Sequence, residues 1–223
     1  MKLALMMSTL CIASISMVGC SSKVVEPDQY SGFLKDYSQL KEAESPSGAT
    51  VMRWVDPKLD INKYRSVYIE PTQLYPKPQP TATIPQGTLN GITSYYDQAL
   101  KREVGRSLPL AAGPGPGVIV VRAAITAVSS KTEGLKPYEV IPIALVAAAV
   151  STASGIRDQE TDLATEAVFL DGANNTVLAQ VVRKGTGKPL ENKEQVMKAD
   201  DVKGVIDGWA SDLHQSFLKL KSK

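Results

Sequence analysis

The sequence predicts an α+β fold in which a mostly antiparallel sheet carries two long amphipathic helices packed on one face. Two long segments, 88–108 and 200–220, place apolar side chains at helical spacing. Three others, 118–130, 160–171 and 176–184, are rich in residues that favour strands. Each helix must bury its apolar stripe, and one face of the sheet offers both helices a partner.

The N-terminus has the layout of a secretory signal, which we assign to residues 1–19. Lys2 supplies one positive charge, and an uncharged, mostly apolar run follows it. This run is too short and too polar for a membrane-spanning helix. It ends at Gly19-Cys20, which resembles the lipobox of bacterial lipoproteins, where the cysteine is acylated and becomes the first residue of the mature chain. Met17 stands where that pattern usually has Leu, and the alternative is an ordinary signal with an incidental cysteine.

Cysteine usage supports the anchor. The chain has two cysteines, and Cys11 lies inside the signal, so no disulfide can form within the mature chain. One acyl chain holds a protein to a membrane only marginally, whereas the lipoprotein resemblance implies two or three chains such as palmitate on Cys20. Ser21 follows the cysteine, and in the sorting rule of this class Ser permits export to the outer membrane. We therefore predict a lipid anchor in the outer membrane, with the protein facing the periplasm.

The mature chain is expected to consist of a lipidated tether, 20–29, and a single domain of unknown function, 30–223. The whole chain has 25 basic and 23 acidic residues, a formal net charge of +2, and the charges are dispersed. Nucleic-acid binding is not expected, because the chain has no basic stripe. The expected partners are the membrane, through the lipid on Cys20, and an envelope protein of unknown identity.

The first part of the domain is predicted to hold one short helix and two strands. Within residues 30–44, apolar side chains fall at helical spacing, namely Phe33, Leu34, Tyr37 and Leu40. Residues 50–55 and 64–70 are predicted strands, and the second is richer in strand-favouring residues. The segment 75–86 contains four of the fourteen prolines. It must therefore be an extended loop without regular pairing.

The long helix predicted at 88–108 has an apolar stripe formed by Leu89, Ile92, Tyr96, Leu100, Val104 and Leu108. A glycine–proline run at 113–117 lies beyond its end. The strand at 118–130 has β-branched residues on both faces, which indicates a central position. A hairpin turn at 171–175 joins the two strands that follow. The closing helix carries a second stripe, formed by Val202, Ile206, Trp209, Leu213, Phe217 and Leu220.

Two charged residues, Arg122 and Glu166, stand in the middle of otherwise apolar predicted strands. Their neighbours on the same strand faces are Val118, Val120, Ala124 and Val128 for the arginine, and Ala164, Val168 and Leu170 for the glutamate. A lone charge on such a face is costly unless it is paired or hydrated. If the two strands are neighbours and the faces coincide, we expect Arg122 and Glu166 to form a structural pair across the ladder.

Residues 31–40 form the most distinctive stretch, Ser-Gly-Phe-Leu-x-Asp-Tyr-Ser-x-Leu. Together with the lipobox, Val-Asp-Pro at 55–57, Tyr-Ile-Glu-Pro at 68–71 and the glycine–proline run, it resembles an uncharacterised family of bacterial lipoproteins catalogued as a domain of unknown function. The resemblance covers nearly the whole mature chain. It implies a periplasm-facing lipoprotein with no assigned activity, and it offers no catalytic residues to carry over.

No catalytic, cofactor or metal motif in the sequence is complete. His214, the only histidine, lies beside the apolar stripe of the last helix and is expected at the surface or at its boundary. The acidic cluster at 158–162 lacks the residues of a calcium loop, and the run 185–188 lacks those of a phosphate-binding loop. A hydrolase acting on envelope polymer would need a convergent pair of carboxylates, which is not evident. We therefore expect no enzymatic activity, no cofactor and no metal.

The apolar run Val140–Ile156 carries no charge between Glu139 and Arg157. Its Ala-rich composition and marginal length favour burial in the folded domain over a membrane span. The alternative is a lining for an apolar ligand or a surface for a partner. Two functional hypotheses follow. The first is an envelope protein acting through non-catalytic interactions, and the second is a binding protein for an apolar ligand that uses residues 140–156. An enclosed apolar cavity would favour the second.

Overall fold

The structure is a computed structural model that describes residues 24–131 and 159–222. Its strands are β1 (Lys41–Glu44), β2 (Thr50–Val55), β3 (Ser66–Ile69), β4 (Gln73–Leu74), β5 (Val118–Lys131), β6 (Glu160–Asp171) and β7 (Val177–Thr186). The helices are α1 (Gln86–Val104) and α2 (Lys203–Lys221), and short 3-10 turns lie at Pro27–Gln29, Ile61–Lys63 and Ala199–Asp201. These elements confirm the predicted α+β class.

The seven strands form one sheet in the order β1-β2-β7-β6-β5-β3, and β4 also pairs with β5. Strands β3 and β4 run parallel to β5, and every other pair is antiparallel. Helix α1 connects β4 to β5 and so supplies the crossover that a parallel pair requires. The central position predicted for 118–130 and the hairpin predicted at 171–175 are both confirmed.

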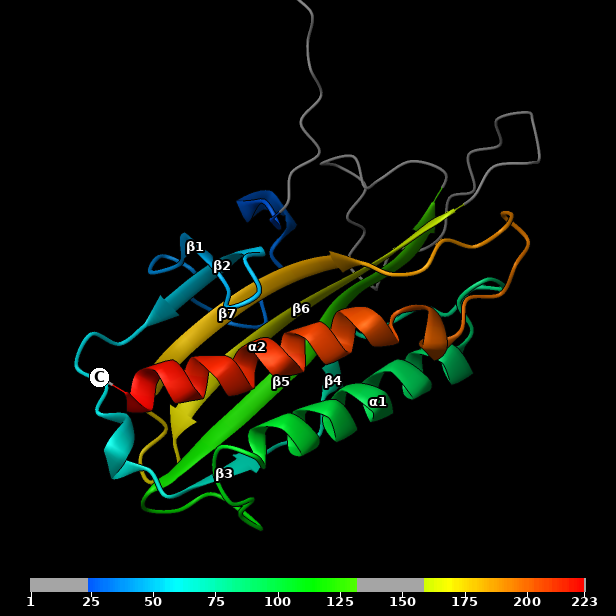
Figure 1. The fold of residues 1–223 in the computed structure, drawn as a ribbon. Helices are drawn as coiled ribbons and strands as arrows, with labels where there is room; N and C mark the ends of the chain where they lie inside the picture. The colour runs from blue at the N-terminus through cyan, green and yellow to red at the C-terminus, as the bar shows by residue number, and fades with distance from the viewer. Residues whose placement is uncertain (1–23, 132–158, 223) are drawn as a thin grey trace, which may run out of the picture.

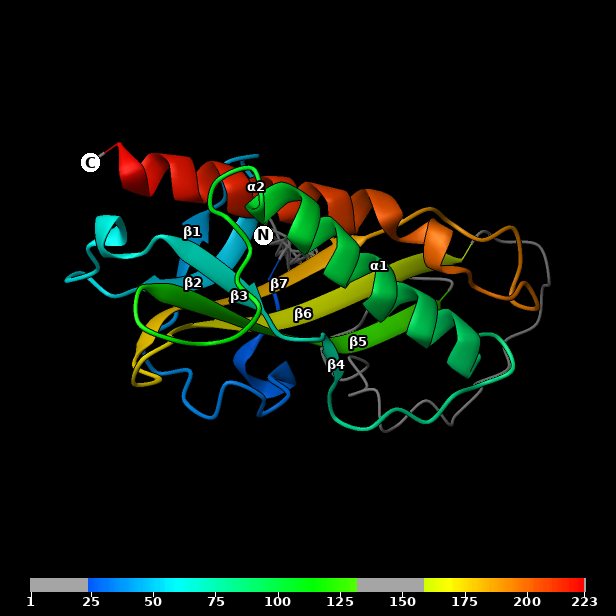
Figure 2. The same cartoon turned by 90° about the horizontal axis from the view of Figure 1, so that it is seen from below.

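Both helices lie side by side on one face of the sheet, which we call the helical face (Figures 1 and 2). Every stripe residue predicted for α1 is buried. The helix ends at Val104 rather than at Leu108, which is buried in the turn that follows. In α2 the stripe is buried except for Leu213 and Leu220, which are only half-buried. The periodic pattern therefore predicted the helical face well, apart from one end of α2.

The helix predicted within 30–44 is wrong. This segment forms turns, with positive φ angles at Gly32 and Lys35, and β1 follows it. The backbone N–H groups of Gly32 and Leu34 donate to the hydroxyl of Tyr37 at 2.7 and 3.3 Å. Side-chain acceptors of this kind compete with helical hydrogen bonds. The spacing of the apolar residues resembles a helical stripe, but the local polar contacts decide the conformation.

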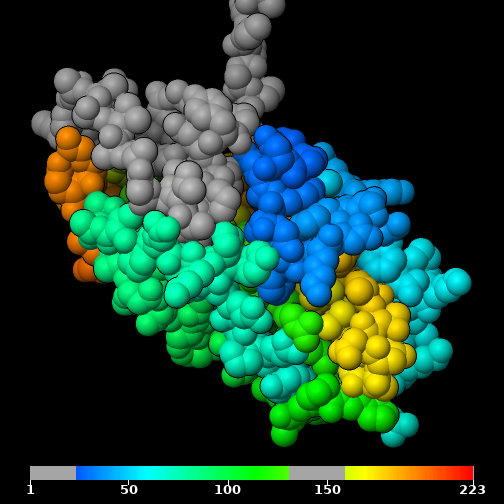
Figure 3. All heavy atoms as spheres, turned by 180° about the vertical axis from the view of Figure 1, so that it is seen from behind, coloured from blue at the N-terminus to red at the C-terminus, as the bar shows by residue number. Residues whose placement is uncertain are grey.

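The opposite side of the sheet, which we call the N-terminal face, has a smaller core of its own. It joins Val25, Leu34 and Leu40 from the N-terminal segment to Val120, Ala127, Ala164, Val168, Leu170 and Val182 from the sheet. Figure 3 views this face from behind, with the N-terminal segment in blue beside the loop before α1 in blue-green. The rings of Phe33 and Tyr75 join the two segments, with centroids 5.6 Å apart. The sheet is therefore covered on both faces.

Two regions singled out in the sequence lie outside the described residues. These are the N-terminal residues with Cys20 and the apolar run Val140–Ile156. The burial expected for that run and the anchor expected at Cys20 stay predictions. Among the helices of the described ranges, none combines the length and apolarity needed to cross a bilayer. The described chain is already packed at Val25, which is 3% exposed and belongs to the core of the N-terminal face.

Candidate functional site: a cavity beneath helix α2

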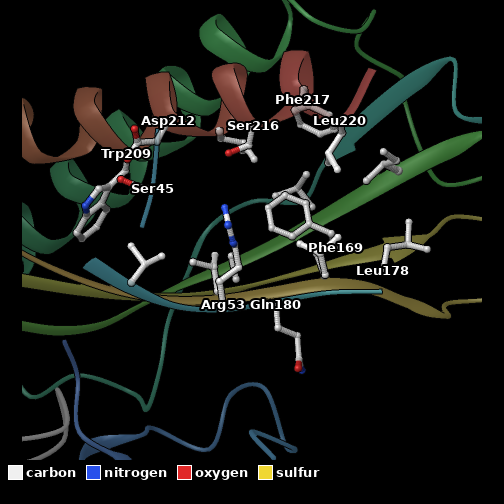
Figure 4. Close-up of a pocket in the computed structure, with 18 of the residues that line it drawn as sticks. Ser45, Arg53, Phe169, Leu178, Gln180, Trp209, Asp212, Ser216, Phe217 and Leu220 are labelled. Atoms are coloured by element: carbon white, nitrogen blue, oxygen red, sulfur yellow. The ribbon is translucent and has the colours of Figure 1, made fainter. Parts of the chain in front are cut away.

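A cavity of about 540 Å³ lies between the C-terminal half of α2 and the helical face of the sheet (Figure 4). Small side chains on the sheet leave this room. Ala123, Ala167 and Val181 occupy paired positions on β5, β6 and β7, and Arg53 on β2 is the partner of Val181. The four residues form one row across the sheet, and all of them line the cavity. The row ends in a cation.

The upper wall of the cavity comes from α2. It consists of Trp209, Asp212, Leu213, Ser216, Phe217 and Leu220. The half-buried state of Leu213 and Leu220 follows from this hollow, because their inner surfaces face space rather than packed side chains. Phe169 and Leu178 add apolar surface from the sheet. The cavity is therefore mostly apolar, with a few polar groups at defined places.

Arg53 projects from β2 into the space below α2, whereas Gln180 of the adjacent strand points away on the N-terminal face (Figure 4). The side chain of Arg53 is half-buried. No hydrogen bond or ion pair joins its guanidinium to any of the described residues, so its donors are available to a ligand. A guanidinium matches a planar carboxylate through two parallel hydrogen bonds.

A buried ion pair stands at one end of the cavity. Arg183 on β7 is 8% exposed, and its Nη2 donates to Oδ2 of Asp212 on α2, which is 5% exposed. Its Nη1 donates to the carbonyl oxygen of Trp209 at 3.2 Å, whereas its buried Nε has no acceptor within the described part of the chain. The Asp212 carboxylate also accepts from the backbone and the hydroxyl of Ser47 at 2.8 and 3.1 Å. This network ties α2 to the β1–β2 turn and neutralises the buried carboxylate of the cavity lining.

The remaining charges of the lining are placed differently. Glu44 and Lys219 are exposed and therefore hydrated. Asp56 accepts a hydrogen bond from the backbone of Lys58 at 2.8 Å. Basic and acidic residues of the lining are equal in number. Arg53 is the half-buried charged residue of this lining that has no partner among the described residues. An anion is the complement of that arrangement.

A second polar cluster lies on the N-terminal face, around Glu166. This side chain is 1% exposed. It accepts from the backbone N–H of Ser31 at 2.8 Å and from the hydroxyl of Tyr37 at 2.6 Å. Burial, followed by the hydrogen bond to Glu166, raises the pKa of Tyr37 to about 12. The distinctive stretch 31–40 thus has a structural explanation, because it wraps its backbone and one tyrosine around a buried carboxylate.

The predicted pair between Arg122 and Glu166 is wrong. The two residues do share a face, since Arg122 pairs with Val168 and Ala124 with Glu166 in the ladder. Arg122 instead forms a bidentate ion pair with Glu70, at 2.6 and 2.8 Å, just beyond the end of β3. The hydrogen bond to Glu70 raises the pKa of Arg122. The sequence correctly predicted that Arg122 and Glu166 lie on the same face of the sheet. It could not show that a residue beyond the end of a third strand, Glu70, is the partner of Arg122.

A register shift in β5 corrects another detail of that prediction. It falls between Ile125 and Ala127. Ala127 therefore belongs to the core of the N-terminal face, and Val128 belongs to the helical core rather than to the face of Arg122. A bulge of this kind inserts one unpaired residue and exchanges the two faces of the strand beyond it.

His214 is buried, at 6% exposure, and not at the surface as expected. Its Nδ1 lies 2.6 Å from the hydroxyl oxygen of Ser107, which follows α1. This contact resembles the first half of a serine–histidine dyad, which would also need a group that orients the ring and an adjoining cleft. Neither residue lines the cavity beneath α2. In the described ranges the pair joins the end of α1 to α2, which is a structural role.

The other sequence candidates are also structural where they are described. Gly187 lets β7 approach the turn before α2, because a Cβ there would lie 2.3 Å from the carbonyl oxygen of Asp201. Asp162 is buried and accepts from the hydroxyl of Thr186 at 2.8 Å. Glu160 is exposed, and Asp158 lies outside the described residues. No group of three potential metal ligands gathers anywhere in residues 24–131 and 159–222.

Sequence reasoning missed Arg53 and the cavity. The strand 50–55 was predicted, but its arginine carries no motif. The sequence feature that could have indicated the cavity is the pair of alanines on two other strands, Ala123 and Ala167. They form the floor of the cavity only because the strand register aligns them with Arg53. That register depends on the whole sheet and is not visible in any single segment.

Comparisons with known proteins place the chain among lipoproteins. A family model described as "Protein of unknown function (DUF3313)" matches residues 29–213. The "Uncharacterized lipoprotein YdcL" of Escherichia coli K12 is 41% identical over 198 residues, which cover 89% of each chain. The same protein of Escherichia coli O157:H7 matches equally well.

Two solved structures show weaker likenesses. A PelC dodecamer from Paraburkholderia phytofirmans is 13% identical with a TM-score of 0.37, over 73% of this chain and 97% of that one. The hypothetical protein CT253 from Chlamydia trachomatis is 10% identical with a TM-score of 0.34, over 56% and 73%. Likenesses at this level say nothing about what this chain does.

Proposed function

Because this chain belongs to the DUF3313 family and is a close relative of a lipoprotein, we propose that it is a lipid-anchored envelope protein that acts by non-catalytic binding. The anchor would be the lipid on Cys20, and the protein would face the periplasm from the outer membrane. The lipobox and the Ser21 that follows it support this address. The partner on one side is then the membrane itself, and a ligand or envelope protein is the partner on the other.

The distance from the anchor to the fold supports a fixed placement. Val25, which packs into the core of the N-terminal face, is the fifth residue after Cys20. Five extended residues reach at most about 18 Å. A lipid on Cys20 would hold the N-terminal face close to the bilayer. The cavity beneath α2 lies on the other face of the sheet and would be turned toward the periplasm.

The observation that carries the binding proposal is the cavity. Its lining is mostly apolar, and its few polar groups include an unpaired arginine, which is the usual composition of a small-molecule site. Histidine and cysteine are absent from this lining, within the described residues, so its two serines, Ser45 and Ser216, have no histidine beside them that could act as a base. A binding role requires nothing beyond the groups already in place. The hypothesis that Val140–Ile156 adds to an apolar site stays a prediction.

The anchor is tested by labelling and fractionation. Cells that express the protein with a radiolabelled fatty acid should give a labelled wild type in the outer-membrane fraction and an unlabelled Cys20→Ser variant. Cys11→Ser, in the signal, is the matched control and should keep the label. Ser21→Asp should move the protein to the inner-membrane fraction. Label remaining on the Cys20→Ser protein contradicts the anchor.

Binding through the cavity is tested by cross-linking in intact cells. A photoreactive residue replaces Ser216, which lines the cavity, or Gln215, which is exposed on the same helix. We expect one specific adduct from position 216 and none from position 215, identified by mass spectrometry. Adducts at position 215 alone would move the binding surface to the outside of α2 and contradict the proposed site.

A further inference from the structure

We infer that the cavity beneath α2 binds a single-chain amphiphile with a carboxylate head, whose head group pairs with Arg53 while its alkyl chain lies over the small side chains of the sheet. This inference rests on the proposed binding function and names its ligand class. It depends on three features of the described residues: the position of a free cation, the shape of the apolar floor, and the size of the space.

The cation stands at the edge of the cavity rather than at its centre. Arg53 on β2 is the last residue that lines the cavity in the row that begins at Ala123 on β5, and the next residue in the row, Lys41 on β1, is exposed and lies outside the lining. A ligand with its acidic head on Arg53 therefore directs its remainder inward along that row. The half-buried guanidinium is partly shielded from water, so an ion pair there is stronger than one on the open surface.

The other arginine of the lining does not compete for the head group. Nη1 and Nη2 of Arg183 are bonded to the Trp209 carbonyl oxygen and to Asp212, and its Nε is buried, without an acceptor among the described residues. Because this Nε is not exposed to the cavity, the donors open to a ligand are those of Arg53.

The floor of the cavity suits an alkyl chain. The methyl groups of this floor lie in one row across three neighbouring strands, on Ala123, Ala167 and Val181. Larger apolar surfaces come from Phe169 and Phe217. No described side chain among these five can donate or accept a hydrogen bond, so a polar tail would lose its hydration without compensation. A flexible hydrocarbon gains from burial, at about 0.8 kcal/mol for each CH₂ group.

The volume of the cavity suits a single alkyl chain. A CH₂ group is similar in size to a water molecule, whose share of the liquid is about 30 Å³. A cavity of about 540 Å³ then holds roughly eighteen such groups. That number matches one fatty acid of ordinary length with its head group. A free fatty acid, or a molecule with the same head and chain, is the occupant that size and charge favour.

The experiment uses the mature lipoprotein in nanodiscs of a zwitterionic phospholipid. The probes are 11-bromoundecanoate and the uncharged 11-bromo-1-undecanol. The bromine quenches nearby tryptophan, and Trp209 lines the cavity. All proteins carry Trp54→Phe, because the second tryptophan of the chain packs on the N-terminal face. Saturable quenching by the carboxylate is expected, with weaker binding of the alcohol. Empty nanodiscs correct for partition into the bilayer, and the mass of the intact protein reports its lipid separately, so a failed anchor and an empty cavity give different results.

Three variants decide the outcome. Arg53→Gln should lower the affinity for the carboxylate probe by about tenfold to a hundredfold, the loss expected for one charge-assisted contact. It should leave the affinity for the alcohol probe unchanged. Val181→Phe should weaken the binding of both probes, because the larger side chain occupies the space above the floor of the cavity. Arg65→Gln, at an exposed arginine outside the cavity, should change neither. Unfolding temperatures check that each variant is folded. Unchanged carboxylate binding in Arg53→Gln, or full quenching in Val181→Phe, overturns the inference.

Discussion

The two faces of the sheet are covered in different ways. On the helical face, two amphipathic helices bury a large apolar core, and the buried Arg183–Asp212 pair lies at one end of the cavity. On the N-terminal face, an irregular segment of turns covers a smaller core with a buried carboxylate, Glu166, beside it. The helical face depends on repeated spacing, and the N-terminal face depends on a few hydrogen bonds with fixed partners. The comparison shows that equally buried surfaces can be specified by different kinds of sequence information.

The same contrast divides the proposed roles. The N-terminal segment lies closest in sequence to the proposed lipid, and hydrogen bonds from Ser31 and Tyr37 fix it to Glu166. The helical face is well packed under α1 but hollow under the C-terminal half of α2. A rigid attachment on one face and an unfilled space on the other suit a protein that is held at a membrane and binds a ligand on its far side.

The largest expected effect lies on the helical face. Ile206 is 0% exposed and belongs to the main core. Ile206→Ala should lower the free energy of unfolding by about 4 kcal/mol, because it removes a buried side chain and leaves a void in close packing. Urea denaturation followed by circular dichroism measures this loss. Leu213→Ala, over the existing cavity, should cost only about 1 kcal/mol. Equal losses at the two positions would mean that the C-terminal half of α2 is packed as tightly as the rest.

Predictability from sequence follows the same division. The apolar stripes of α1 and α2 could be predicted because a helix repeats its burial every turn, and tertiary packing did not alter that pattern. The strand 118–130 could be predicted because it is rich in β-branched residues, and the strand 160–171 because an apolar stretch with Val168 and Phe169 precedes a hairpin turn. The segment 30–44 could not, since Tyr37 accepts hydrogen bonds from two backbone groups that a helix would need. Its glycine and its lysine at positive φ are visible only in three dimensions.

The candidate site was less predictable than the fold. Arg53 stands in a strand that was predicted, but nothing in residues 50–55 indicates that its charge lacks a partner. That property depends on which residues of β7 and α2 surround it, and on the short side chains of Ala167 and Ala123 in the same row. A cavity is a difference between volumes contributed by distant segments, so no local pattern records it.

The second largest effect is expected at the buried carboxylate. Glu166→Ala leaves the Ser31 N–H and the Tyr37 hydroxyl without their acceptor, and should cost about 3 kcal/mol of unfolding free energy. Glu160→Ala changes an exposed glutamate on the same strand and is the matched control, with little expected effect. Limited proteolysis should also cut the variant first within residues 24–40. A loss no greater than that of the control would show that the hydrogen bonds to Glu166 do not stabilise the N-terminal face.

A smaller effect, with a distinct pH dependence, is expected for Tyr37→Phe. At neutral pH the loss of the hydroxyl should cost about 1.5 kcal/mol. The pKa of Tyr37 is about 12 in the folded state and about 10 when the chain is unfolded. The folded state therefore binds more protons between these values, so this contribution to stability is complete below pH 10 and is lost as the pH rises toward 12.

Denaturation midpoints measured from pH 8 to 12 test this sign. The wild type should lose more stability than Tyr37→Phe across the interval, so the difference between the two proteins should shrink as the pH rises. Tyr64 has a pKa raised to about 12 by burial and by its hydrogen bond to Asp171, so some alkaline loss remains in the variant. A constant difference at every pH would show that the hydroxyl of Tyr37 is not held in the native state as described.

The smallest effect is expected for the ion pair at the edge of the N-terminal face. Arg122 and Glu70 are 40% and 24% exposed, so water and salt weaken their attraction, although their geometry is bidentate. A double-mutant cycle with Arg122→Met and Glu70→Gln should give a coupling of about 0.5 kcal/mol. The parallel cycle of Arg122→Met with Glu166→Gln should give a coupling near zero, because these residues share a strand face without a bond between them. Added salt should reduce the first coupling and leave the second unchanged. The two cycles use the same arginine variant, so they compare its partners directly. A larger coupling to Glu166 than to Glu70 would join the arginine to the buried cluster and extend the polar network of this face across the whole strand.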